Sequence, residues 1–212
     1  MLDVAELIDG YRRFLATRYP EQAGLYRKLA DVGQSPKTMV IACCDSRADP
    51  ATIFDAAPGQ LFVVRNVANL VPSCEREGFY HGTSAALEFA VTGLAVENIV
   101  VMGHARCGGV RAFLDGLARP PAQRGFIDRW LSLLTPVGAE VLGDTAGQAI
   151  EVRQQALEHA SVRHSLRNLE SFPFIRERLA AGTLHLYGAF FDIADGRLLG
   201  LDRDSGRFTA VE

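Results

Sequence analysis

Two patterns of apolar residues alternate along the chain and predict its elements. Short, continuously apolar runs cover 38–43, 61–65 and 98–103 and are typical of strands buried on both faces of a parallel sheet. Apolar residues recurring every three or four positions predict helices at 4–15, 81–94, 107–117, about 148–168 and about 174–180. The alternation predicts an α/β fold with a mainly parallel sheet covered by helices.

The remaining segments predict the boundaries of these elements. Ala194-Asp195-Gly196 separates two apolar runs, which predicts a hairpin with an antiparallel edge strand. Proline and glycine at 118–125 and 135–147 predict loops around a helix near 126–134. We expect Pro20 to end the first helix. Since no linker of domain size interrupts the pattern, residues 1–212 should form a single domain.

The composition of the chain argues against some classes of binding partner. The 212 residues are 48% hydrophobic and 22% charged, with a net charge of -3 and no cluster of lysine and arginine. Such a chain offers no electrostatic case for binding nucleic acid or an acidic membrane. No apolar stretch approaches the roughly 18 residues of a membrane span. Asp3 and Glu6 stand where a secretory signal would be positively charged, so we expect a cytoplasmic protein.

Metal-ligating residues follow two of the predicted strands. The segment Cys-Cys-Asp-Ser-Arg at 43–47 ends the first strand, and Gly-His-Ala-Arg-Cys-Gly-Gly at 103–109 ends the third. Because ligands bind beyond the carboxyl ends of parallel strands, we expect Cys43, His104 and Cys107 to meet there. Two thiolates and one imidazole suit Zn²⁺, whose catalytic sites keep a fourth position open.

Asp45 and Arg47 add a second functional group to this site. Residues two apart in an extended loop point the same way, so Arg47 can bind Asp45 through two parallel hydrogen bonds. Held in this way, Asp45 keeps an oxygen for the fourth zinc ligand; released, it could bind zinc itself. A structural salt bridge beside a structural zinc is the alternative interpretation.

These motifs resemble those of the β-class carbonic anhydrases. Family members carry Cys-x-Asp-Ser-Arg and His-x-x-Cys in this order, and the likeness continues through 33–37, 58–72, 81–91 and 165–177, closest to the plant-type subgroup. The resemblance implies one zinc per chain and reversible hydration of CO₂ to bicarbonate and a proton by zinc-bound hydroxide. It also implies an open site, in which the pairing of Asp45 with Arg47 leaves the fourth position to water.

The resemblance also implies a substrate pocket and an assembly. Gln34 matches an amide that binds substrate, Phe62 and Val67 match apolar pocket positions, and the Gly108 N–H should lie beside the metal. Phe89 stands where the plant-type pocket often has tyrosine. Family members are homodimers or multiples of dimers, so we expect a projecting amino-terminal helical arm at 1–32 that embraces a partner chain.

Two other functions stay open. The same zinc site could hydrolyse carbonyl sulfide or carbon disulfide, or the chain could be a zinc or thiol protein without hydratase activity. No Cys-x-x-Cys pair supports redox chemistry. The remaining candidates favour ordinary structural roles: Cys44 as a small buried neighbour, Cys74 as a loop thiol, 202–206 as a turn, and His81, His159, His164 and His185 as packing or surface residues.

Overall fold

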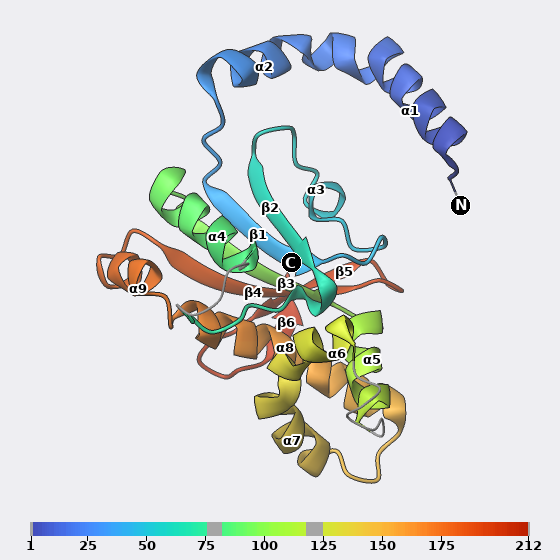
Figure 1. Cartoon of the computed structure of the whole chain (residues 1–212), viewed down its shortest axis with the longest axis vertical. Helices are drawn as coiled ribbons and strands as arrows, with labels where there is room; N and C mark the ends of the chain where they lie inside the picture. Colours follow the sequence, from blue (N-terminus) through green and yellow to red (C-terminus); the bar gives the residue numbers. More distant parts are fainter. Residues whose placement is uncertain (1, 76–81, 118–124, 212) are drawn as a thin grey trace. The chain divides into compact units, whose positions relative to one another are not determined.

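The computed structural model describes residues 2–75, 82–117 and 125–211 (Figure 1). His81 and nearly all of the expected loop at 118–125 lie outside these residues. The chain divides into two compact units, residues 1–35 and 36–212. No helix within the described residues is long and apolar enough to span a membrane.

The first unit consists of two helices, α1 (Val4–Ala16) and α2 (Arg18–Val32). Asp3 begins α1 with a capping box, since its carboxylate accepts the Glu6 N–H at 2.8 Å and Glu6 accepts the Asp3 N–H at 2.7 Å. The prediction that Pro20 ends the first helix was wrong. Pro20 lies in the first turn of α2, where its missing N–H costs no helical hydrogen bond.

The second unit is built on one six-stranded sheet in the order β2-β1-β3-β4-β5-β6. The first four strands of this order are parallel, and β5 and β6 are antiparallel additions at the edge, which confirms the predicted fold class. The strands are β1 (Thr38–Cys43), β2 (Leu61–Asn66), β3 (Asn98–His104), β4 (His185–Asp192), β5 (Arg197–Leu201) and β6 (Phe208–Ala210).

The two faces of the sheet are covered unequally by the elements of the second unit. Met39 and Ile41 point into the main core, beneath α4 (Gly82–Glu88), the π-helical turn η2 (Phe89–Gly93), α8 (Ile150–Leu169) and α9 (Pro173–Ala180). Val40 lies on the opposite face, where the short helix α3 (Pro50–Ile53) contributes Ile53 to a much smaller cluster. On that face Val63 and Tyr187 remain 37% and 51% exposed.

Helices α5 (Gly108–Gly116), α6 (Phe126–Leu131) and α7 (Thr135–Asp144) group beside α8, with the 3-10 turn η4 (Ser132–Leu134) between α6 and α7 (Figure 1). The prediction of a loop at 135–147 was wrong, because most of it is α7. Gly138 is buried against Phe113 of α5, where an added Cβ would lie 2.9 Å from the ring. Glycine serves close helix packing here, whereas the sequence pattern suggested a turn.

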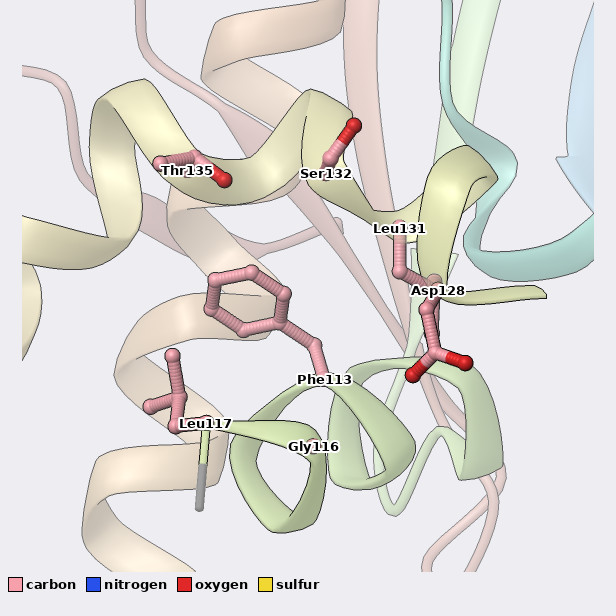
Figure 2. A pocket seen from close by; sticks show the side chains of 7 residues that line it. All are labelled: Phe113, Gly116, Leu117, Asp128, Leu131, Ser132 and Thr135. Carbon is pink, nitrogen blue, oxygen red and sulfur yellow. The ribbon is translucent and has the colours of Figure 1, made fainter. Parts of the chain in front are cut away.

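A pocket of about 190 Å³ lies between α5 and the chain from α6 to α7. Figure 2 shows the Phe113 ring pointing from α5 toward the segment that carries Ser132 and Thr135. None of the seven lining residues is a predicted site residue. The pocket therefore belongs to the packing of this helical group.

Candidate metal centre

Cys43, His104 and Cys107 form one buried cluster, as predicted. Cys43 ends β1 and His104 ends β3, and these two strands are parallel neighbours. Cys107 is the N-cap of α5. The two Sγ atoms are 3.9 Å apart, and the ligand atoms of all three residues lie within 4.8 Å of one another.

The donor set fits zinc. Tetrahedral geometry with Zn–S bonds of about 2.3 Å requires roughly 3.8 Å between two sulfurs, close to the observed separation. His104 Nδ1 lies 3.0 Å from the Ala105 carbonyl oxygen. That contact places a proton on Nδ1 and leaves the Nε2 lone pair for a metal. Nε2 is buried without a hydrogen-bond partner among the described residues, which is costly unless a metal fills the site.

The electrostatics of the cluster favour at least one thiolate. A hydrogen bond from Cys107 lowers the pKa of Cys43 to about 4, against the opposing effect of burial. The same hydrogen bond, together with burial, raises the pKa of the Cys107 thiol. Burial lowers the pKa of His104, but its interactions with Cys43, the Ala105 carbonyl and Asp45 together outweigh burial and raise the pKa overall. Metal binding must therefore displace the proton that the two thiols share.

Arg47 fixes the carboxylate of Asp45 beside this cluster. Its Nε and Nη2 donate to the two carboxylate oxygens at 2.9 and 2.8 Å, and its backbone N–H donates to Oδ1 at 3.0 Å. Arg47 Nη2 also donates to the Arg106 carbonyl at 3.3 Å. These bonds hold the pKa of Asp45 well below its usual range. Asp45 Oδ2 lies 3.8 Å from His104 Nε2, so an ionised carboxylate faces the ligand cluster.

Three polar residues that the sequence analysis did not identify support the site. Arg65 donates to the backbone carbonyls of Cys43, at the end of β1, and of Asp45, in the loop that follows. Glu158 is buried on α8 and accepts the Cys107 N–H at 2.7 Å. Gln154 donates to the Cys107 carbonyl at 3.2 Å and to Glu158 at 2.8 Å. Burial raises the pKa of Glu158. Their roles depend on strand register and helix packing, which motif spacing does not reveal.

Four of the five predicted substrate residues lie on four elements of the second unit, and Gln34 belongs to the first unit. The rings of Phe62 on β2 and Phe89 in η2 contact each other, with centroids 5.8 Å apart. Val67 begins the 3-10 turn η1 (Val67–Asn69), and Gly108 begins α5 directly after Cys107. Their substrate roles stay predictions.

The structure corrects one minor assignment and agrees with others. Cys44 is exposed, so the expectation that it is a buried neighbour was wrong: the chain leaves the sheet after Cys43. Cys74 lies in a loop and is half-buried. His159 packs between the rings of Phe190 and Phe208, at centroid distances of 4.4 and 4.5 Å, as expected of a packing residue.

Comparison with known proteins agrees with the geometry of the site. The carbonic anhydrase family model matches residues 38–198. Beta carbonic anhydrase 3 of Arabidopsis thaliana is 37% identical over 199 residues, which cover 92% of this chain and 76% of that protein.

Solved structures show the same similarity. The β-carbonic anhydrase CcaA superposes with a TM-score of 0.90 at 29% identity, covering 98% of both chains. One of two tetrameric β-carbonic anhydrases from Sordaria macrospora superposes with a TM-score of 0.81 at 31% identity, covering 96% of this chain and 97% of that one. The chain therefore belongs to the β class of carbonic anhydrases, resembles its plant members, and is a zinc enzyme of that family.

Proposed function

We propose that the chain catalyses the reversible hydration of CO₂ to bicarbonate and a proton, with Asp45 and Arg47 keeping the fourth zinc position open. The observation that carries this proposal is the position of the Asp45 carboxylate, which Nε and Nη2 of Arg47 hold beside the ligand cluster. A purely structural zinc site would fill its fourth position with a protein ligand. Among the described residues, only Cys43, His104 and Cys107 form a metal-ligating cluster.

Each residue has a distinct part in this proposal. Cys43 Sγ, Cys107 Sγ and His104 Nε2 would hold zinc, which when bound supplies hydroxide at neutral pH by acidifying water. The ionised Asp45 carboxylate accepts a hydrogen bond from the reacting water, and so orients it. Arg47 neutralises that carboxylate and occupies both of its oxygens, which opposes its movement onto the metal. The Gly108 N–H, at the start of α5, is the proposed donor to the substrate.

The apolar pocket residues would bind the substrate before it reacts. CO₂ carries no net charge, so an apolar wall can receive it without loss of a strong hydrogen bond. Phe62 and Phe89 supply adjoining rings, and Val67 lies next to the start of α5. The substrate-binding role of Gln34 stays a prediction from the family resemblance.

Stopped-flow assays test the proposal. The zinc-loaded chain should hydrate CO₂ rapidly, while Asp45→Asn, which keeps the size but not the charge, should lose at least about 10-fold in kcat at unchanged zinc content. Carbonyl sulfide serves as the competing substrate. Fast turnover of carbonyl sulfide without CO₂ hydration would contradict the proposal, and so would an Asp45→Asn variant with full CO₂ activity.

We also propose a homodimer or a multiple of dimers. Two apolar surfaces support it: α1 exposes Val4, Leu7 and Tyr11, and the sheet face with Val63 and Tyr187 is only partly covered. Continuously apolar strands are expected to be covered on both faces, and a second copy would complete that cover. Sedimentation velocity should give at least a dimer, and a stable active monomer would contradict the proposal. The cytoplasmic location stays a prediction.

A further inference from the structure

Arg65 joins the end of β2 to the loop that follows β1. It pairs in register with Ala42, one residue before the strand end. Its Nε donates to the Cys43 carbonyl at 2.9 Å, and its Nη2 donates to the Asp45 carbonyl at 2.7 Å. Its Nη1 donates to the Asp49 carboxylate at 2.9 Å. All three guanidinium nitrogens therefore bind the segment 43–49.

These contacts fix the backbone from which the Asp45 side chain leaves. The carbonyls of Cys43 and Asp45 lie on either side of Cys44, so two hydrogen bonds from one rigid planar group limit the rotation of the peptides between them. Arg47 acts at the other end, on the carboxylate itself, but its side chain is 50% exposed. Arg65 is 27% exposed and is the more enclosed of the two cations.

Asp49 holds Arg65 in turn. Its Oδ1 accepts the Thr52 N–H at 3.0 Å and so caps α3, while its Oδ2 binds Arg65. The carboxylate is thus anchored to a helix start and cannot follow the guanidinium freely. A chain of contacts runs from α3 through Asp49 and Arg65 to the backbone of Asp45.

We propose that Arg65 is a positioning residue that keeps the Asp45 carboxylate beside the fourth zinc position without allowing it to enter. Asp45 Oδ2 already lies 3.8 Å from His104 Nε2, so a short movement of the loop would bring the carboxylate onto the metal that His104 holds. Arg65 opposes this movement from the backbone side, and Arg47 opposes it from the side-chain side. The inference rests on the proposed function for its catalytic meaning, but the geometry can be tested separately.

The test uses Arg65→Met, which keeps much of the side-chain volume and removes all three donors, and Arg65→Lys, which keeps the charge with a single donor group. Arg178→Met is the matched control. Arg178 is also partly buried and donates to two backbone carbonyls, those of Val91 and Thr183, at 3.0 and 2.7 Å, but it contacts no site residue. The control therefore measures the general cost of losing such an arginine.

Cobalt replaces zinc in these proteins, and azide is titrated while the visible spectrum of the cobalt is recorded. An anion that enters an open fourth position changes this spectrum. Per bound cobalt, Arg65→Met should bind azide at least about 10-fold more weakly than the wild type, since losing a residue that orients a metal site typically costs 10- to 100-fold. Arg65→Lys should lie between the two, and Arg178→Met should match the wild type.

A second measurement, of hydrogen exchange, needs no metal. Hydrogen exchange in the metal-free protein should quicken across 43–49 in Arg65→Met but not in Arg178→Met. Unchanged azide affinity together with unchanged exchange in Arg65→Met would overturn the inference. If Arg65→Met does not fold, Arg65→Lys decides by the same two readings. A wild type that fails to hydrate CO₂ would refute the proposed function alone, because neither reading depends on CO₂ turnover.

Discussion

Gly109 sets the distance between α5 and the turn η1, and replacing it with alanine should destabilise the fold beside the metal site. An added Cβ would lie 2.7 Å from Val67 Cγ1, 3.0 Å from Ala68 Cβ and 3.3 Å from the Ala68 backbone nitrogen. Ordinary contacts between such atoms are about 3.5–4.0 Å. The valine methyl can rotate away, but the Ala68 atoms belong to the backbone or are attached to it directly.

Gly108→Ala is the matched control, because a Cβ there meets no heavy atom within 4 Å. Both glycines lie in the first turn of α5, so the gain in helix propensity is similar and cancels in the comparison. What remains is overpacking, typically about 1–3 kcal/mol. Since 1 kcal/mol shifts the Tm of a chain of this size by about 2–4 °C, Gly109→Ala should melt about 2–12 °C below Gly108→Ala.

Urea denaturation and calorimetry at one fixed protein concentration measure this difference, because assembly makes stability depend on concentration. Gly138→Ala is a second comparison. Its Cβ would lie 2.9 Å from Phe113 Cε1, but that ring borders the pocket in Figure 2 and has room to move. We expect it to cost less than Gly109→Ala. Equal stability of Gly109→Ala and Gly108→Ala would refute the reasoning.

Four further predictions follow from the site. Glu158→Ala should lose about 1–3 kcal/mol of unfolding free energy, because it leaves the buried Cys107 N–H without an acceptor. Glu158→Gln keeps an acceptor and should lose less. Equal losses in the two variants would argue against a stabilising role of this hydrogen bond. Cys44→Ser should keep full zinc content and hydration, since Cys44 is exposed; a drop in bound zinc would show that it is a ligand. Removing zinc with a chelator should lower the Tm by about 5 °C or more, and a Tm unaffected by chelation would speak against metal in the native state. Arg47 lowers the pKa of Asp45, so the stability that the pair contributes is present above about pH 4 and is lost as pH falls further. In metal-free protein, Arg47→Ala should therefore be at most about 1 kcal/mol less stable than the wild type at neutral pH. A stability difference between the two proteins that grows on acidification would contradict this pH dependence.

The sheet and the metal cluster could be predicted because both follow from local patterns. The apolar runs predicted three parallel strands, and parallel strands bring their carboxyl ends to the same edge of the sheet. Cys43 and His104 therefore lie close together, because β1 and β3 are neighbouring strands. The pairing of Asp45 with Arg47 was predictable for a similar reason, since the two residues are only two positions apart and one loop decides their geometry.

Other features depend on packing between distant segments. The α7 segment contains proline and glycine that usually mark loops, but Pro136 fits the first helical turn and Gly138 receives Phe113. Arg65 gains its role only from the register of β2 on β1, and Glu158 lies 51 residues from Cys107 on a long helix. Residue spacing predicts neither the contacts of Arg65 nor that of Glu158, so the sequence could not distinguish these two side chains from ordinary charged surface residues.

The most direct test of the account is a zinc titration of the metal-free protein, in which bound zinc and CO₂ hydration are measured on the same samples. Hydration should rise in proportion to bound zinc and stop rising at one zinc per chain, and Cys107→Ser should bind little zinc and stay inactive. A fully zinc-loaded chain that does not hydrate CO₂, or hydration that persists without zinc, would contradict it.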